Sequence, residues 1–355
     1  MHNNDATDQL EQQVRQAIAD KQAVNIRAGG SKDFIGSMAD LPVIDVSQHR
    51  GVVFYEPTEL VLTARAGTPL CEITDTLAEH GQKLAFEPPL YNDNATLGGT
   101  VAAAACGPAR PYLGGVRDHV LGCRLINGHG HVLRFGGEVM KNVAGYDITR
   151  LMTGAMGTLG LLLDISLKVV PIAEQEVTLQ QELDLHTALP RLQQLASESP
   201  LVSASAWHNG TVYIRLAGVT AAVESAVKMF GGEQTDSDFW SLLNNQQHAF
   251  FEQQAPLWRI SVPPLTPALD IAGSTLYDWT GTQRWCFTEH DARNIRNIAS
   301  AAGGHAQLFK AEDNLKRRVG AFHPQTNEIM KLHHNIKREF DPHSLFNPGR
   351  LYDGV

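Results

Sequence analysis

The chain has no long hydrophobic run and no stretch rich in Lys and Arg. Its apolar stretches are shorter than the roughly 18 residues that a membrane-spanning helix needs, and its N-terminus lacks the apolar segment of a signal peptide. The net charge of −9 argues against a surface that binds nucleic acid by neutralising phosphates. We therefore expect a cytoplasmic protein.

Cysteine is scarce and scattered. The four cysteines are far apart in the sequence and form no C-x-x-C pair: Cys71, Cys106, Cys123 and Cys286. This spacing argues against a disulfide framework and against a ferredoxin-type iron–sulfur cluster. We interpret the cysteines as reduced, buried thiols.

Two familiar site patterns are also missing. No G-x-G-x-x-G follows a strand, and Gly154, Gly157 and Gly160 are spaced three apart instead, so an ordinary nicotinamide dehydrogenase is a poor hypothesis. The adjacent His333 and His334 lack the helical i,i+4 spacing and the nearby carboxylate of a zinc site. We predict no metal site.

The length of 355 residues and the order of elements predict two domains. A glycine-rich part with several short strands extends to Pro171. Beyond it, the periodicity predicts strand, helix, strand, an Asn209-Gly210 turn, strand and helix, an order typical of a ferredoxin-like unit. No internal repeat is apparent in the sequence. The fold class that we expect is α+β.

Glycines gather in loops that favour an anionic ligand. Arg27-Ala28-Gly29-Gly30-Ser31-Lys32 follows a predicted strand, and its backbone N–H groups can converge on a pyrophosphate; a plain turn is the alternative. Thr96-Leu97-Gly98-Gly99 opens a helix of small residues, where an anion or a flat ring can approach closely; a tightly packed structural helix is the alternative.

Two further segments complete the set. Lys141 to Asp147 and Gly154 to Gly160 precede an apolar strand, and Phe340 to Arg350 closes the chain with F-D-P-H-S-L-F-N-P-G-R. Taken in this order, the four glycine-containing segments resemble the FAD-binding fold of the vanillyl-alcohol oxidase and p-cresol methylhydroxylase (PCMH) superfamily. The stretches FGGEVMKNVAGYDITRLMTGAMGTLG, EPTELVLTARAGTPL and FNPGRLY look like the FAD-binding subunits of bacterial glycolate oxidases.

This resemblance implies the domain organisation and the cofactor. It implies a PCMH-type FAD-binding domain over residues 1–172, a ferredoxin-like cap domain over 173–320, and a C-terminal segment over 321–355 that packs back on the FAD domain. FAD is expected to be noncovalent, because Ser31-Lys32 stands where some members of the superfamily carry a linking histidine. The implied FAD contacts are Ala28, Gly29, Gly30, Ser31, Lys32, Pro89, Thr96, Gly98, Gly99, Gly145, Gly157, Thr158, Gly160, Asn347 and Arg350.

The resemblance also implies a function. It points to the FAD-binding subunit of a multi-subunit glycolate oxidase, or glycolate dehydrogenase, which oxidises glycolate or D-lactate to the 2-oxo acid and passes electrons on. The implied partners are a second flavin subunit and an iron–sulfur subunit, and any membrane contact would be made through the complex. The alternative is a non-catalytic assembly subunit that binds FAD only structurally or not at all.

The catalytic residues are less clearly marked. Related large subunits carry H-x-D-x-N-x-H and E-H-G patterns in their cap domain, and neither occurs between residues 173 and 320 here, which favours substrate chemistry in a partner subunit. Arg259 lies in a predicted strand where its guanidinium can hold a carboxylate, with an ion-paired surface arginine as the alternative. His305 follows Gly303-Gly304 and can act as a base near neutral pH, with a solvated turn histidine as the alternative.

Overall fold

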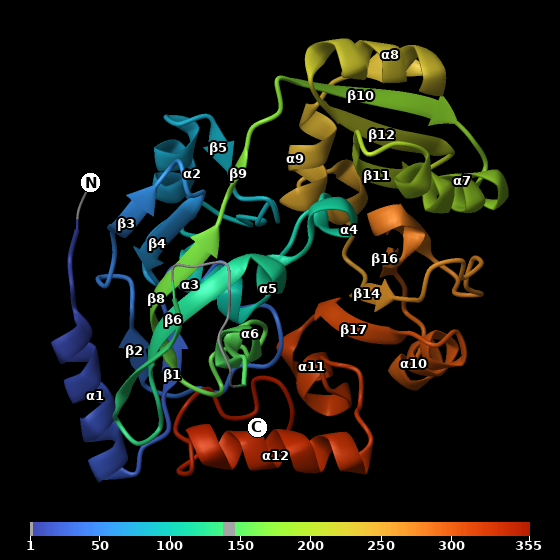
Figure 1. The fold of residues 1–355 in the computed structure, drawn as a ribbon. Coiled ribbons are helices and arrows are strands. Elements are labelled where there is room, and N and C mark those ends of the chain that lie inside the picture. The colour runs from blue at the N-terminus through green and yellow to red at the C-terminus, as the bar shows by residue number, and fades with distance from the viewer. Residues whose placement is uncertain (1–2, 138–145) are drawn as a thin grey trace. The chain divides into compact units, whose positions relative to one another are not determined.

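The computed structural model describes residues 3–137 and 146–355, which divide into two compact units (Figure 1). The first unit comprises Met1–Ala105, Gly115–Pro171 and Pro324–Val355, and the second comprises Cys106–Gly114 and Ile172–His323. Both units mix helices and strands, so the expected α+β class is confirmed. None of the helices in the described ranges is long and apolar enough to cross a membrane.

The first unit is built around a five-stranded antiparallel sheet with the order β3-β4-β8-β6-β7. The two strands at its centre are buried along almost their whole length, as their apolar sequences require. β6 and β7 form a hairpin about the turn at residues 127–131, as the glycines there predict. The strands are β3 (Val52–Glu56), β4 (Val61–Arg65), β6 (Val120–Ile126), β7 (Val132–Gly136) and β8 (Leu161–Lys168).

Two small strand pairs and six helices complete this unit among the residues described. A parallel pair joins β1 (Asn25–Arg27) to β2 (Val43–Asp45), and an antiparallel pair joins β5 (Gln82–Lys83) to β9 (Val170–Pro171). Helix α3 packs on the central strands β4 and β8. The helices are α1 (Thr7–Asp20), α2 (Leu70–Ala78), α3 (Leu97–Ala102), α5 (Val116–His119), α6 (Ile148–Met152) and α12 (Asn327–Phe340), with α4 (Arg110–Leu113) in the second unit.

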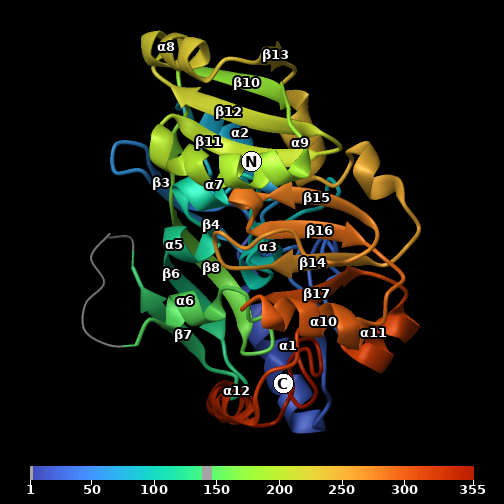
Figure 2. The same cartoon turned by 90° about the vertical axis from the view of Figure 1, so that its right-hand side faces the viewer.

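The second unit contains an eight-stranded antiparallel sheet with the order β13-β10-β12-β11-β15-β16-β14-β17, which Figure 2 shows as a stack. The strands are β10 (Gln175–Glu182), β11 (Val202–His208), β12 (Thr211–Gly218), β13 (Glu233–Thr235), β14 (Leu257–Ser261), β15 (Ser274–Asp278), β16 (Gln283–Phe287) and β17 (His305–Lys310).

This sheet is a topological repeat that the sequence does not reveal. The half from β10 to β13 has the strand order β13-β10-β12-β11, in which the first strand lies between the fourth and the third and the second strand follows the third. This is the ferredoxin-like order. The half β14 to β17 has the same order. In the first half, α7 connects the first strand to the second. In the second half, the helix-free segment 262–273 makes the same connection, between β14 and β15. The repeat is one of strand order, and it accompanies no repeat that is apparent in the sequence.

Helices cover one face of each half. α7 (Leu185–Glu198) and α8 (Thr220–Phe230) pack on the first half, and α10 (Ala292–Ala301) packs on the second. α9 (Asp238–Asn244) and α11 (Asp313–Val319) also belong to this unit, with short 3₁₀ turns at Ala249–Glu252 and Trp279–Gly281. The unit also takes in the short segment Cys106–Gly114, where Tyr112 Oη lies 2.8 Å from Ser205 Oγ and Trp279 Nε1 donates to the carbonyl of Gly107 at 3.0 Å.

A buried ion pair fixes the C-terminal segment within the first unit. Lys337 on α12 donates from Nζ to Asp341 Oδ2 at 2.8 Å, to the carbonyl of Thr158 at 2.7 Å and to that of Phe346 at 2.9 Å. Burial lowers the pKa of Lys337, and the carboxylate of Asp341 opposes that shift. The carboxylate also accepts the backbone N–H groups of Leu345 and Phe346. One ammonium therefore ties the chain end to the glycine-containing loop that precedes β8.

Replacing Lys337 with Met is expected to lower the free energy of unfolding by about 3 to 5 kcal/mol, because Asp341 keeps a buried charge without its counter-ion. Equilibrium urea unfolding measures the change. Lys331→Met is the matched control, since Lys331 is exposed on the same helix, and it should change stability by less than about 0.5 kcal/mol. Equal stability of the two variants would show that the ion pair does not hold the segment.

Candidate functional site

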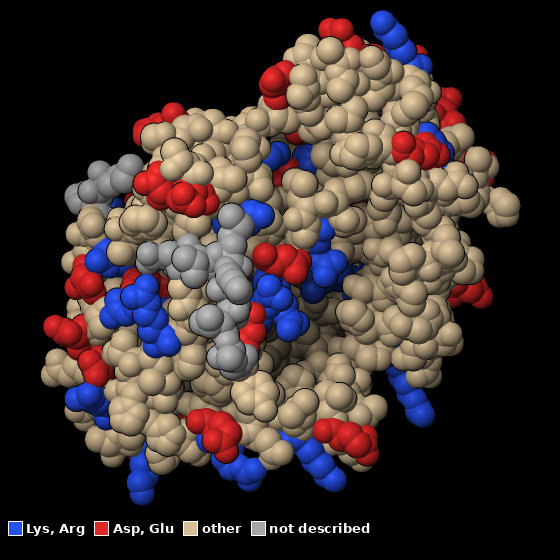
Figure 3. Space-filling view, in the orientation of Figure 1, with Lys and Arg blue, Asp and Glu red and all other residues tan. Residues whose placement is uncertain are grey.

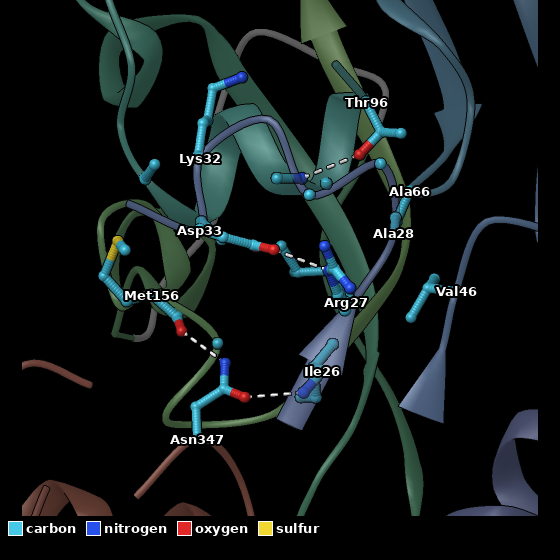
Figure 4. Close-up of a pocket in the computed structure, with 18 of the residues that line it drawn as sticks. Ile26, Arg27, Ala28, Lys32, Asp33, Val46, Ala66, Thr96, Met156 and Asn347 are labelled. Carbon is cyan, nitrogen blue, oxygen red and sulfur yellow. Dashed lines mark hydrogen bonds and ion pairs between the residues drawn. The ribbon is translucent and has the colours of Figure 1, made fainter. Parts of the chain in front are cut away.

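A cavity of about 800 Å³, counted with its open mouth, lies in the first unit (Figure 4). Three segments far apart in the sequence surround it: the loop after β1, the start of α3 and the loop before β8, with the C-terminal segment beside them.

The loop after β1 forms the first wall, because glycine lets it pass close to another segment. A Cβ placed on Gly29 would lie 1.5 Å from the carbonyl oxygen of Asn94, so no other residue fits there. Gly30 has a φ of +69°, which favours glycine. Arg27 Nε and Asp33 Oδ2 form an ion pair at 2.7 Å that closes the loop on itself. The loop is therefore held with its backbone towards the cavity.

The start of α3 forms the second wall. Thr96 caps the helix, its Oγ1 accepting the N–H of Gly99 at 3.4 Å. The next two glycines have different neighbours: a Cβ on Gly98 would lie 2.7 Å from Cβ of Ala66, whereas a Cβ on Gly99 would meet only Thr96 Oγ1, at 3.4 Å. Gly98 is thus required for packing on β4, and Gly99 faces the space of the cavity.

The loop before β8 forms the third wall, and Asn347 joins it to β1, where the first wall begins. Its Nδ2 donates to the carbonyl of Met156 at 2.7 Å, and its Oδ1 accepts the N–H of Ile26 at 2.7 Å (Figure 4). The two bonds use opposite ends of one amide, so they fix the distance between β1 and the loop before β8. Asn347 has a φ of +43°, a conformation that asparagine tolerates better than most residues.

Positive charge is concentrated at one end of the cavity. Lys32 is only 6% exposed, and its Nζ has a Ser31 hydroxyl at 3.2 Å and the Tyr91 ring centroid at 5.6 Å. Burial lowers the pKa of Lys32 to about 8. Arg350 also lines the cavity and donates from Nη2 to the carbonyl of Lys32 at 3.1 Å. Because Asp33 is already paired with Arg27, the lining favours an anion.

The structure brings most of the residues expected to contact FAD to this one cavity. Pro89 is buried and is not part of the lining. Thr158 is fully buried, and its hydroxyl donates to the carbonyl of Ala155 at 2.8 Å. Gly145 lies outside the described residues. The expected residues that line the cavity are Ala28, Gly29, Gly30, Ser31, Lys32, Thr96, Gly98, Gly99, Gly157, Gly160, Asn347 and Arg350.

Sequence reasoning missed the apolar part of the lining. The run of alanines that follows Gly99 was a signal for close approach, and two of them do face the cavity. The other apolar side chains come from strands and from the loop before β8, where nothing in the local sequence marks them. They are Ile26, Met38, Val46, Ala66, Ala102, Ala103, Met156 and Leu162.

The two catalytic candidates lie together in the second unit. Arg259 on β14 pairs in register with Gln307 on β17, and Ser261 pairs with His305. Arg259 and His305 are therefore on the same face of adjacent strands, although they are 46 positions apart (305 − 259) in the sequence. Arg259 is half-buried and donates to Gln307 Oε1 at 2.6 Å, so it is not a free surface arginine.

The four cysteines are free and differ in exposure. Cys123 and Cys286 are buried, and burial raises the pKa of each thiol to about 11, as an inert thiol requires. Cys71 is exposed, so the expectation of buried thiols is wrong there: its side chain points outward from α2. The residues described contain no group of three potential metal ligands. Charged side chains of both signs are interspersed on the face in Figure 3.

The cavity fits a dinucleotide cofactor. Its open side at Gly99 admits a ligand against the helix backbone, the buried ammonium of Lys32 can neutralise a phosphate, and the apolar side chains suit an aromatic ring. Each of these features belongs to described residues of one unit. The arrangement can therefore bind an anionic, partly aromatic ligand.

Comparisons with known proteins identify the cofactor of the chain and its family. Residues 5–136 match the family model described as "FAD binding domain", and FAD is the cofactor of this chain. A solved structure of alkyldihydroxyacetonephosphate synthase superimposes with a TM-score of 0.65 at 14% identity, covering 96% of this chain and 75% of that one, which shows a shared fold. The expected PCMH-type fold is thereby confirmed.

Two curated relatives share sequence with the chain. The glycolate oxidase subunit GlcD of Bacillus subtilis (strain 168) is 39% identical over 85 residues, which are 24% of this chain and 18% of that protein. The glycolate oxidase subunit GlcE of Escherichia coli (strain K12) is 43% identical over 348 residues, which are 98% of each chain. This chain belongs to the family of the glycolate oxidase subunit GlcE.

Proposed function

We propose that this chain is the FAD-binding subunit of a multi-subunit complex that oxidises glycolate and passes the electrons to a partner. The observation that carries the proposal is the 43% identity to a glycolate oxidase subunit along 98% of both chains. The cavity supports it, because its glycine loops and buried ammonium suit the pyrophosphate of FAD.

The chemistry that FAD supplies when bound is the two-electron oxidation of a hydroxyl-bearing carbon to a carbonyl. The residues of this chain bind and orient the cofactor. The Gly29–Lys32 loop and the start of α3 would hold the pyrophosphate, and the apolar side chains from β1, β2 and β8 would exclude water from a ring. Asn347 holds the walls of the cavity at a fixed separation through its two amide bonds.

The partners follow from the same relatives. The GlcD relative is named as another subunit of glycolate oxidase, so we infer a second flavin subunit in the complex. We further infer an iron–sulfur subunit as the electron acceptor, because four scattered cysteines cannot provide a ferredoxin-type set of ligands in this chain. D-lactate is a second candidate substrate, supported by the 28% identity of a D-lactate dehydrogenase of Anaerostipes hadrus over 137 residues.

FAD is expected to be released intact by acid precipitation, because Ser31-Lys32 offers no histidine for a covalent link. The measurement compares flavin absorbance in the supernatant and in the washed pellet. Flavin retained on the denatured chain would contradict a noncovalent cofactor.

Gly99→Asp is expected to weaken FAD binding about a thousandfold, because a carboxylate about 4 Å from a phosphate at partial burial costs about 4 kcal/mol. The fold should be preserved, since a Cβ at position 99 meets only Thr96 Oγ1 and an acidic residue suits the first turn of a helix. FAD titration and thermal unfolding of the apoprotein measure the two effects.

Gly99→Ala is the control for added volume without charge and should retain most of the affinity. Gly98→Asp provides the contrasting case, because its side chain would collide with Ala66 and destabilise the apoprotein. A Gly99→Asp variant that purifies with full flavin content would exclude this site.

The affinity for FAD is expected to fall as the pH rises through about 8. Lys32 is protonated below its pKa of about 8, and a bound pyrophosphate raises that pKa, so binding above pH 8 requires the uptake of a proton. The dissociation constant should rise about tenfold per pH unit between the pKa values of the free and the bound states. Titrations between about pH 7 and 9 measure the slope.

Lys32→Arg should bind FAD without this pH step, and Lys32→Met should bind weakly at every pH. If the wild-type protein and Lys32→Met have the same pH profile, another group is responsible.

The isolated chain is expected to bind FAD but to be reduced by glycolate about 10²- to 10⁴-fold more slowly than the assembled complex, the usual loss for a missing general base. The absence of the H-x-D-x-N-x-H and E-H-G patterns from residues 173–320 motivates this expectation. Stopped-flow absorbance of the flavin measures both rates. Equal rates would place the whole reaction in this chain, and a flavin that glycolate does not reduce even in the complex would favour the second candidate, an assembly subunit.

A further inference from the structure

One face of β14 and β17 carries a cluster of polar side chains in the second unit. The opposite face of these strands packs on α10 through Trp258, Ile260, Ala306 and Leu308. Side chains alternate along a strand, so Arg259 and Gln307 project from the other face. They are direct partners in the strand register, and Arg259 Nη2 donates to Gln307 Oε1 at 2.6 Å.

The orientation of the Gln307 amide is fixed by this bond. A guanidinium has only donors, so the oxygen of the amide must face Arg259 and the NH₂ group must point away. Gln307 is only 4% exposed, and its Nε2 has no hydrogen-bond partner within the described chain. A buried donor without an acceptor costs about 1 to 3 kcal/mol, which a ligand that accepts its hydrogens would recover.

The neighbours of this amide favour an anion of small size. The guanidinium of Arg259 lies over the Phe309 ring, 5.2 Å from its centroid, and Trp285 packs edge-on against the same ring at 5.0 Å. These rings limit the space on one side and lower the local dielectric, which strengthens a charged hydrogen bond. Arg259 and the amide NH₂ present donors only, and the two oxygens of a carboxylate match two such donors.

His305 lies two residues from Gln307 along β17 and on the same face. Burial lowers its pKa, and so do Arg259 and His323. Its imidazole is therefore neutral near pH 7 and can accept a hydrogen bond.

We propose that Arg259 and Gln307 hold the carboxylate of a small 2-hydroxy acid on this strand pair, with His305 accepting a hydrogen bond from its hydroxyl group. The choice of a hydroxy acid rests on the proposed function, whereas the carboxylate site rests on the buried amide and its paired arginine. Gln307 is then a substrate-positioning residue that sequence patterns do not mark.

Oxalate titration of the FAD-loaded chain, followed by calorimetry, tests the site, because oxalate has carboxylates but no hydrogen to lose. Gln307→Glu is the key variant: it keeps an oxygen for Arg259 and replaces the donor with a negatively charged acceptor. We expect it to weaken oxalate binding at least tenfold, the usual effect of losing a hydrogen bond to a charged group and adding repulsion. Arg259→Lys should also weaken binding, because it removes the planar fork.

Arg293→Lys is the matched control, since Arg293 is exposed on α10 at the other face of the same sheet. It should bind oxalate as the wild-type protein does. Equal oxalate affinity in Gln307→Glu and the wild type, or no saturable binding in the wild type, would overturn the site.

Glycolate-driven flavin reduction in the assembled complex separates this proposal from the function. If the complex reduces its flavin with glycolate while Gln307→Glu binds oxalate normally, only the carboxylate site is wrong. If the complex fails to use glycolate while Gln307→Glu loses oxalate, the site stands and the proposed substrate fails.

Discussion

The cavity of the first unit depends on the buried ammonium of Lys337. Two of its three acceptors, Asp341 and Phe346, come from the chain that follows α12, and the third, Thr158, comes from the loop before β8. By fixing Phe346, the ammonium places Asn347, whose amide then bridges β1 and Met156. Residues more than 300 positions apart in the sequence are thus set at hydrogen-bond distance by one charge and one amide. The backbone of Val24, which accepts from Asn347 and donates to Leu345, holds the same segment against the start of β1.

The same anchoring holds the buried ammonium of Lys32, which has no carboxylate partner in the ranges that the structure describes. Desolvating the Lys32 ammonium is unfavourable, as its lowered pKa shows, and it persists because the loop that carries it is held at both ends. Gly29 packs against Asn94 on one side, and Arg350 binds the carbonyl of Lys32 on the other. An anionic cofactor recovers the cost of desolvation. The stability of the chain end is therefore coupled to the affinity of the cavity.

The sequence predicts the backbone of this site better than its side chains. A glycine in a loop indicates a local constraint on the backbone. Gly29, Gly30 and Gly99 could therefore be assigned to a ligand-binding loop from the residues next to them in the sequence. The bonds of Asn347 and the bond from Lys337 to Thr158 reach distant segments, and nothing near these residues in the sequence shows where those partners are. The ferredoxin-like order of the first half of the second unit was predictable from its strand and helix periods. Its repeat was not, because a helix-free segment replaces one crossover.

Arginines in the second unit show how structural and ligand-binding roles differ. Arg284 and Arg296 donate to backbone carbonyls, which are fixed acceptors that close loops, so their charges are consumed in holding the fold. Arg259 donates instead to a side-chain amide, and an amide that accepts at one end must donate at the other. The group left without an acceptor is therefore Nε2 of Gln307, and an acceptor for it must come from outside these two strands. A carboxylate site is the arrangement in which every one of these groups is paired.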